Sequence, residues 1–182
     1  MAVTAVNDAP VAAAVIVSTS EDTPVAVSLS GTDPDGDALA AVLVSLPAHG
    51  TLSGTLPALI YTPDADWNGT DHFSFVVTDG IAVSAELIAV VEVAPVNDRP
   101  VAQAQSLTGS EDVSVPLTLT AADADGDPLA FTIVLPPQHG VLTGSGSELV
   151  YQPDPDWHGI DRFSFTAADA LETSLPAAVT IE

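Results

Sequence analysis

Two stretches of the chain decide its fold: YTPDADWNGTDHFSF at residues 61–75 and YQPDPDWHGIDRFSF at residues 151–165. They lie 90 residues apart, and the same offset holds without a gap along the rest of the chain. VNDAP at residues 6–10 recurs as VNDRP at residues 96–100, and roughly four positions in ten are identical between the copies. A repeat of this length is too long for a solenoid. Each copy is therefore expected to be a domain with its own core, at residues 1–95 and 96–182, with a linker at about 94–98.

Within each copy, apolar and polar residues alternate with period two, as in half-buried β-strands. Phe73, Phe75 and Val77 alternate with residues of the opposite face, and so do the apolar residues between Leu87 and Val93. Further Val-, Ala- and Leu-rich runs at residues 10–17, 24–30 and 39–46 predict one strand each, and Pro, Gly and Asp clusters separate them. About seven short strands in 90 residues predict an all-β protein. We expect two tandem Greek-key β-sandwich domains of cadherin or immunoglobulin-like type.

The chain has 25 acidic and two basic residues, a formal net charge of -23 and no cysteine. This charge excludes ordinary nucleic-acid binding, in which Lys and Arg neutralise phosphates, and it argues against an anionic membrane surface as partner. The chain is nevertheless 47% hydrophobic, which a disordered acidic tail would not be. No run of 18 apolar residues is present, so we expect no direct membrane insertion. A monomer without disulfides is the resulting expectation.

Most of the acidic residues hold the same place in both copies. Eleven acidic positions recur, which accounts for 22 of the 25 acidic residues, and most of them fall in turns between the predicted strands. Two carboxylates ~4 Å apart repel by about 4 kcal/mol at an effective dielectric constant near 20. A cluster of carboxylates therefore needs a cation, and oxygen ligands in loops without clustered His or Cys favour Ca²⁺.

Some of the recurring acidic residues fit roles other than calcium binding. The loop that begins at Asp64 matches the start of an EF-hand, but Phe75 stands where the bidentate Glu belongs, which excludes that motif. Asp71 and its counterpart Asp161 could bind metal or could hydrogen-bond loop backbone, as could Asp37 and Asp127. We expect Asp22, Asp112, Glu92 and Glu182 to be solvated or to protect sheet edges. No nucleophile or phosphate-binding motif is present, so we expect no enzyme.

The order of the motifs resembles the cadherin repeat. Glu21 comes first, followed by D-x-D-G at Asp33, the pair Asp64 and Asp66, a strand that ends in Asp79, and the N-D of the linker. The Y-x-P and G-x-D-x-F-x-F motifs are more similar to the cadherin-like tandem repeats of large secreted bacterial adhesins, including RTX-type proteins. The resemblance covers both copies. It implies an extracellular or bacterial cell-surface location and neighbouring repeats of the same chain as partners.

The resemblance also implies the calcium ligands. A complete cluster between the copies would comprise Glu21, Asp64, Asp66, Asn97, Asp98, Asp123, Asp125 and Asp169. Half a cluster would be formed by Asn7, Asp33, Asp35 and Asp79. The linker NDRP is one residue shorter than in cadherins, and Asp66 stands where cadherins have Glu.

The resemblance and the carboxylates together predict a calcium-binding, calcium-rigidified extender segment of an adhesin. The alternative is a calcium-dependent module that binds a polysaccharide, another protein or another cell surface, with Trp67 or Trp157 as a stacking platform. Because both tryptophans recur beside Tyr61 and Tyr151, packing within the domain is the simpler expectation for them.

Overall fold

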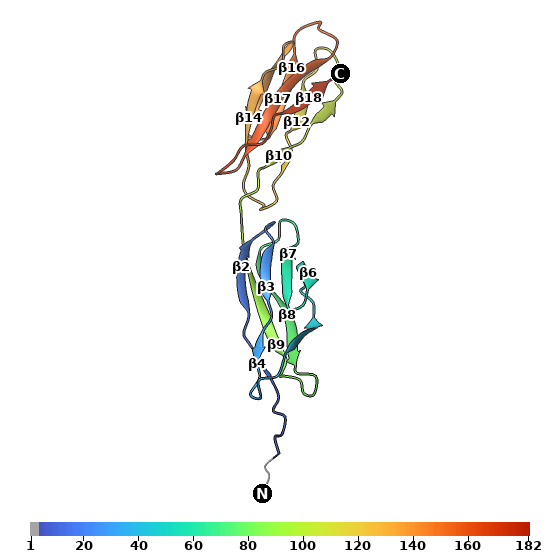
Figure 1. Cartoon of the computed structure of the whole chain (residues 1–182). Coiled ribbons are helices and arrows are strands. Elements are labelled where there is room, and N and C mark those ends of the chain that lie inside the picture. Colours follow the sequence, from blue (N-terminus) through green and yellow to red (C-terminus); the bar gives the residue numbers. More distant parts are fainter. Residues whose placement is uncertain (1–3) are drawn as a thin grey trace. The chain divides into compact units, whose positions relative to one another are not determined.

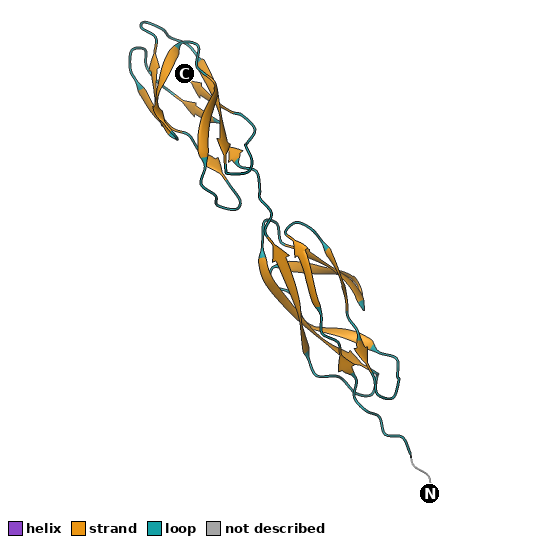
Figure 2. Ribbon diagram, turned by 90° about the vertical axis from the view of Figure 1, so that its left-hand side faces the viewer, coloured by secondary structure: helices purple, strands orange, loops and turns teal. Residues whose placement is uncertain are grey.

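Alternating apolar residues give each segment one face to bury, and the computed structural model shows the β-strands that result. The structure describes residues 4–182, and these contain strands and no helix. The chain divides into a first unit, Met1–Val96, and a second unit, Asn97–Glu182; residues 1–3 lie outside the described part. Both units are drawn in Figure 1, and Figure 2 shows that loops join strands throughout. The prediction of an all-β chain with two sandwich domains is confirmed.

The first unit is a sandwich of a four-stranded and a three-stranded sheet, in the strand orders β2-β9-β8-β5 and β3-β7-β6, with a separate short pair β1-β4. Its strands are β1 Val11–Ala12, β2 Ile16–Ser20, β3 Val25–Ser28, β4 Gly31–Thr32, β5 Ala40–Ser45, β6 Gly50–Thr55, β7 Ala58–Pro63, β8 Gly69–Thr78 and β9 Leu87–Ala94.

The second unit repeats this arrangement, in the orders β11-β18-β17-β14 and β12-β16-β15, with the pair β10-β13. Its strands are β10 Val101–Ala102, β11 Gln105–Leu107, β12 Val115–Thr118, β13 Ala121–Ala122, β14 Ala130–Leu135, β15 Gly140–Ser145, β16 Glu148–Pro153, β17 Asp161–Ala168 and β18 Ala177–Ile181.

The prediction of a single strand at residues 10–17 is wrong, because this run serves two sheets. Val11 and Ala12 pair with β4, whereas the segment from Ile16 onward pairs in parallel with β9. Between them, the Ala13 N–H donates to the Ser30 carbonyl at 2.8 Å, so the backbone is hydrogen-bonded on one side before it changes partner. An apolar run does not reveal such a change of sheet, because the residues remain apolar on both sides of it.

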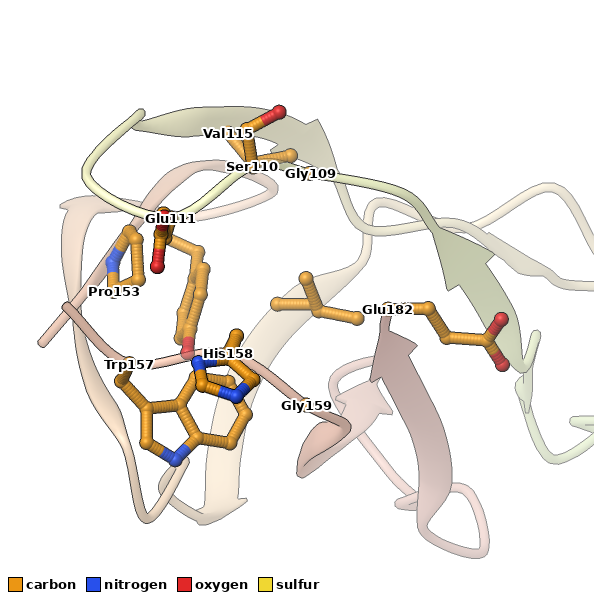
Figure 3. Close-up of a pocket in the computed structure, with 11 residues that line it drawn as sticks. Gly109, Ser110, Glu111, Val115, Pro153, Trp157, His158, Gly159 and Glu182 are labelled. Atoms are coloured by element: carbon orange, nitrogen blue, oxygen red, sulfur yellow. The ribbon is translucent and has the colours of Figure 1, made fainter.

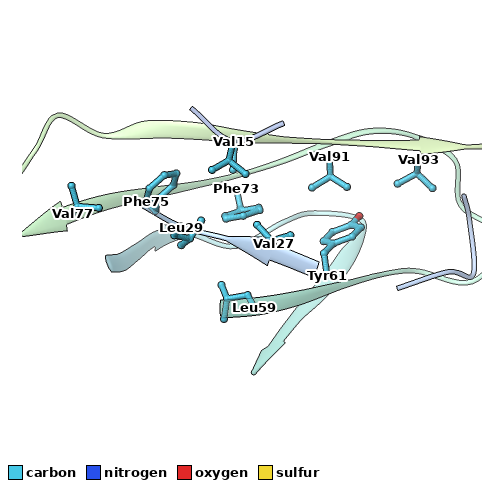
Figure 4. Close-up of a cluster of buried hydrophobic side chains, with 11 residues drawn as sticks. Val15, Val27, Leu29, Leu59, Tyr61, Phe73, Phe75, Val77, Val91 and Val93 are labelled. Carbon is cyan, nitrogen blue, oxygen red and sulfur yellow. The ribbon is translucent and has the colours of Figure 1, made fainter. Parts of the chain in front are cut away.

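The core of each unit lies between its two larger sheets. In the first unit, Phe73, Phe75 and Val77 of β8 are at most 1% exposed and face Val27 and Tyr61 of the opposite sheet (Figure 4). The second unit buries the equivalent Phe163, Phe165 and Tyr151. The residues between these core positions point to the other face of the sheet, which is the period-two pattern of a strand. Val76 is partly exposed there, whereas Ser74 is 4% exposed.

A buried aspartate ties the loop before β6 to this core. Asp71 is 3% exposed, and its carboxylate accepts hydrogen bonds of 2.8 to 3.0 Å from the backbone N–H groups of Ala48, His49 and His72 and from the Tyr61 hydroxyl. The Tyr61 hydroxyl also lies 3.1 Å from the His49 carbonyl. This arrangement, here named the Asp71 clamp, recurs at Asp161 with Tyr151 as its phenol. Of the two roles left open for Asp71, the structure shows the hydrogen bonding of loop backbone.

The clamp sets the ionisation of its members. Burial raises the pKa of the Asp71 carboxyl, but the hydrogen bonds from the Ala48, His49 and His72 N–H groups and from the Tyr61 hydroxyl outweigh it, so the pKa lies below its ordinary value. Burial, together with the hydrogen bond to Asp71, raises the pKa of Tyr61, which keeps the phenol protonated as a donor. Asp71 is therefore a charged acceptor for four donors at neutral pH.

Replacing Asp71 with Asn should destabilise the first unit by about 2–3 kcal/mol, because the amide offers one acceptor oxygen to four donors and leaves buried N–H groups unpaired. Urea unfolding at pH 7 measures the effect, with Glu92→Gln as a control that also removes one negative charge, from an exposed strand position. An equal stability of the two variants would contradict the role of the clamp.

The difference between wild type and Asp71→Asn should depend on pH. Because the folded-state pKa of Asp71 lies below its ordinary value, its contribution to stability is fully present above about pH 4 and is lost as the pH falls through the folded-state pKa. Unfolding curves between pH 6 and pH 2 should therefore converge at the acidic end. A difference that stays constant down to pH 2 would show that ionised Asp71 does not stabilise the fold.

Candidate functional site

The loop between β4 and β5 brings three carboxylates together. Carboxylate oxygens of Asp33, Asp35 and Asp37 all lie within 4.8 Å of one another. Oδ1 of Asp33 accepts from the Asp35 N–H at 2.9 Å and from the Asp37 N–H at 3.2 Å, so its own turn orients this side chain. Gly36, at φ +82°, supplies the left-handed residue that folds the turn back.

The second oxygen of Asp33 is the most informative atom of this loop. Oδ2 is buried and, within residues 4–182, accepts no hydrogen bond. A buried, unpaired carboxylate oxygen is costly, and its cost increases beside the Asp35 and Asp37 carboxylates, which repel it. A cation would remove both costs, so the donor set fits a hard metal ion with oxygen ligands.

Residues from two other segments reach this loop. The Asp8 N–H donates to Oδ2 of Asp35 at 2.7 Å, and the Asn7 amide donates to Oδ2 of Asp79 at 3.0 Å. Asp79 also accepts from the Ile81 and Ala82 N–H groups, both at 2.7 Å. The Ala82 N–H contributes most to lowering the pKa of Asp79, followed by the Asn7 amide. Asp79 is therefore ionised, and its hydrogen bonds hold both of its oxygens.

The second unit reproduces this geometry. Oxygens of Asp123, Asp125 and Asp127 lie within 4.8 Å of one another, and Oδ2 of Asp123 is also buried without a hydrogen-bond donor among the described residues. The counterpart hydrogen bonds join Asp98 N–H to Asp125 at 2.8 Å and the Asn97 amide to Asp169 at 3.1 Å. The Glu172 N–H is the main cause that lowers the pKa of Asp169. The Asp127 N–H donates to Oδ1 of Asp123 at 3.0 Å, as Asp37 does to Asp33. The two copies therefore hold the same carboxylates through several corresponding hydrogen bonds.

A second group of acidic residues includes Glu21 and the turn after β7. Glu21 is 3% exposed; its Oε1 accepts from the Val96 N–H, and its Oε2 is buried with no donor among the described residues. The Glu21 N–H donates to the Ala94 carbonyl at 2.9 Å. In the second unit, the equivalent Glu111 is exposed. Glu21 is thus held by backbone through one oxygen and has the other available for a ligand.

Asp22 lies beside Asp66. The sequence analysis did not predict this proximity. The Asp66 N–H donates to Oδ1 of Asp22 at 3.2 Å, and carboxylate oxygens of the two residues lie within 4.8 Å. Both have positive φ, of 57° and 55°, and their counterparts Asp112 and Asp156 repeat the bond at 3.1 Å. Asp22 is exposed, as expected, but it is not an isolated solvated charge. Asp64 is exposed in the same turn, where its carbonyl accepts from the Trp67 N–H at 3.3 Å.

Each tryptophan stacks on a histidine of its own unit. The rings of Trp67 and His49 are 4.4 Å apart and nearly parallel, at 6°, and those of Trp157 and His139 are 4.6 Å apart at 7°. One face of each indole is therefore covered. In the second unit, Trp157 also borders a pocket of about 130 Å³, together with Glu111 and Tyr151 (Figure 3).

Comparison with known proteins identifies the family. The model of the bacterial Ig domain matches residues 7–92 and again residues 97–182, which together are most of the chain. The chain belongs to this family. Domains of this family are typically extracellular and non-enzymatic. No helix among the described residues is long and apolar enough to span a bilayer.

The solved structures that resemble this bacterial Ig chain include cadherins. The human mucin-like protocadherin EC1-2 structure has a TM-score of 0.54 at 18% identity over 95% of this chain and 97% of that chain. The protocadherin GammaB4 extracellular domain also has a TM-score of 0.54, at 16% identity, over 95% of this chain and 34% of that one. The TM-scores indicate a common fold, so the predicted likeness to cadherin repeats holds at the level of fold.

A curated relative matches part of the chain. Extracellular matrix protein 3 of Lytechinus variegatus is 39% identical over 80 residues, which is 40% of this chain and 2% of that protein. The chain thus spans a small fraction of the relative's length.

Calcium should stabilise the protein through Asp33 and Asp123. We expect added Ca²⁺ to raise the free energy of unfolding, by about 2.7 kcal/mol at 100 times the dissociation constant of one site. Asp33→Asn combined with Asp123→Asn should lower the calcium affinity about tenfold or more, since ligand charge sets the affinity of such sites. Without calcium, the same variant should be at least as stable as wild type, because repulsion is relieved. Scanning calorimetry in EDTA and in calcium measures both effects.

The double variant Glu86→Gln with Glu148→Gln is the matched control, since it removes two charges at exposed positions outside the carboxylate loops. An equal calcium response of wild type and the Asp33/Asp123 variant would exclude these loops as the binding sites.

Proposed function

We propose that this chain is a calcium-binding extender segment of a bacterial cell-surface or secreted adhesin. The observation that supports the proposal best is the duplicated carboxylate loop, in which Asp33 and Asp123 each keep one buried oxygen without a donor. Charges retained only for solubility would not be expected to keep corresponding hydrogen bonds, such as those at Asp35 and Asp125, in two copies that differ at more than half of their positions.

The residues of each loop have separate tasks in this proposal. Asp33 is oriented through Oδ1 by its own turn and presents Oδ2, while Asp35 and Asp37 add negative charge within 4.8 Å. Asp79 is fixed by the Ile81 and Ala82 N–H groups, and Asn7 is fixed by Asp79. When bound, calcium supplies positive charge and accepts six to eight oxygen ligands without strict geometry, which suits side chains from several segments.

The mechanical part of the proposal concerns consecutive repeats. Units joined by a short linker are free to move relative to one another unless a large interface restrains them. In this proposal, which adopts the resemblance to cadherin repeats, the linker residues Asn97 and Asp98 serve as ligands. Calcium held there would restrain the linker, and its removal would leave carboxylates that repel one another. The proposed partners are therefore neighbouring repeats of the same chain.

Extracellular calcium modules bind with dissociation constants of about 10⁻⁴–10⁻³ M. The proposed sites would therefore be filled outside the cell and nearly empty at the far lower calcium level of the cytosol. A protein that becomes stiff only after export fits a role as a spacer on a bacterial surface. The assignment to RTX-type adhesins belongs to this proposal and rests on the sequence resemblance.

A calcium-dependent module that binds polysaccharide is the second candidate function. The pocket beside Trp157 and Tyr151 favours it in the second unit. The stacking of His139 on Trp157, and of His49 on Trp67, disfavours it, because each imidazole covers a ring face that a sugar would use. The spacer role is therefore the better supported of the two.

Small-angle X-ray scattering tests the spacer role. The radius of gyration should increase when calcium replaces EDTA, because carboxylates that repel at a free hinge become ligands that restrain it. Asn97→Ala with Asp98→Asn should reduce this increase, and Glu92→Gln should leave it unchanged. Calcium that binds by calorimetry but leaves the scattering profile unaltered would contradict the spacer role while preserving the metal sites.

A further inference from the structure

The four-stranded sheet of the first unit exposes an aliphatic surface. We define the outer apolar face as the outward-pointing aliphatic residues of β2, β5, β8 and β9: Ile16, Val42, Val44, Val76, Ile88 and Val90. Ile16 is 70% exposed and Ile88 60%. Pairing brings the members together, since Val42 lies opposite Val76 and Ile16 opposite Val90. The hydrogen-bonded Ser45 and Ser74 lie beside Ile88 on the same face. Scattered exposed aliphatic residues are common, but several gathered on one face of a sheet indicate an interaction site.

The fold itself does not require these residues to be apolar. The second unit builds the same sheet in the same order, yet five of the six equivalent positions are small or hydroxylated. The equivalents are Ser106, Thr132, Val134, Thr166, Ala178 and Thr180. Most core positions stay apolar in both units even where the residue changes, as from Val27 to Leu117, whereas this surface changes from aliphatic to small or hydroxylated. Folding alone therefore does not account for the aliphatic residues of the first unit.

A hollow beside this face carries a negative charge. It has a volume of about 250 Å³ and is bordered by Glu86, His72 and Ile88, with Ser45, Ser74 and Phe73 completing it. Glu86 and His72 are exposed. The second unit has Pro176 in place of Glu86 and Arg162 in place of His72, so the charge at this position changes from acidic to basic between the copies.

We propose that the outer apolar face of the first unit is a docking surface for a different protein, one with an aliphatic patch bordered by Lys or Arg. The aliphatic residues would be covered by that patch, and a cation of the partner would reach Glu86 in the hollow. This surface lies on a sheet face rather than on the carboxylate loops, so its use does not depend on calcium.

A second copy of this chain suits the surface less well. The whole chain carries a net charge of -23 with two arginines and no lysine. Two such chains therefore repel each other, and neither offers a basic border. Charge complementarity therefore favours a basic partner.

The test compares two versions of the whole chain for binding to one probe. The probe is a 14-residue amphipathic peptide of leucine and lysine, whose leucine face is bordered by lysines. The variant transfers the outer face of the second unit to the first: Ile16→Ser, Val42→Thr, Val76→Thr, Ile88→Ala and Val90→Thr. It changes no charge, and the second unit already folds with these residues, so circular dichroism should show an unchanged fold. Calorimetry in EDTA at 0.15 M salt gives the affinity.

We expect the wild type to bind at least about tenfold more tightly than the face variant, because several aliphatic contacts are lost. Glu86→Gln should weaken binding about two- to fivefold at low salt, with a smaller effect at high salt. The reciprocal transfer to the second unit, with Ser106→Ile, Thr132→Val, Thr166→Val, Ala178→Ile and Thr180→Val, should strengthen binding and does not rely on a destabilised first unit.

Equal binding by wild type and the face variant would show that net charge alone attracts the peptide, which would overturn the proposal. Absence of binding by the wild type would also overturn it. Sedimentation of the wild type as a dimer, with the face variant a monomer, would show that this face binds its own copy, and would replace the proposed partner.

Discussion

A carboxylate oxygen that leaves water needs hydrogen-bond donors or a cation, and the acidic residues of this protein divide according to which of the two they have. Asp71 and Asp161 lie inside the sandwich and receive four donors each, one of them a phenol. Asp33 and Asp123 keep one buried oxygen with no donor among the described residues. The first pair holds a loop on the core of each unit, and the second pair sits in the loops proposed to bind calcium. One chemical requirement thus links the stability of the fold to its proposed function.

The acidic residues that give the chain its net charge of -23 differ in their surroundings. Acidic residues that form the clamps are stabilised in their charged form by backbone and phenol hydrogen-bond donors. Those gathered in the loops of Asp33 and Asp123 repel one another, and the proposed calcium would offset that repulsion. Three acidic residues, Glu86, Glu148 and Glu172, have no acidic counterpart in the other unit, and all three lie on exposed surface. The two units therefore agree in the clamps and the carboxylate loops and differ at these three surface charges.

The sequence predicted the sandwich because period-two alternation at Phe73, Phe75 and Val77 reports directly on a buried face. It could not predict that residues 10–17 serve two sheets, since an apolar run carries no signal for a change of partner. The ligand role of Asp33 and Asp35 was expected from the resemblance to cadherin repeats, whereas the role of Asp37 was left open between metal binding and hydrogen bonding of loop backbone. The role of Asp71 was left open because its donors at Ala48 and His49 are more than 20 residues away. Asp22 was missed for the same reason, as its partner Asp66 belongs to another turn.

The central claim is that the unpaired oxygens of Asp33 and Asp123 are calcium ligands. A crystal structure of the chain grown with calcium, with anomalous scattering used to identify the ions, tests it most directly. We predict an ion about 2.3–2.6 Å from Oδ2 of both residues, within a shell of six to eight oxygens. Calcium found elsewhere, with both oxygens turned to water or bound to protein donors, would contradict the account.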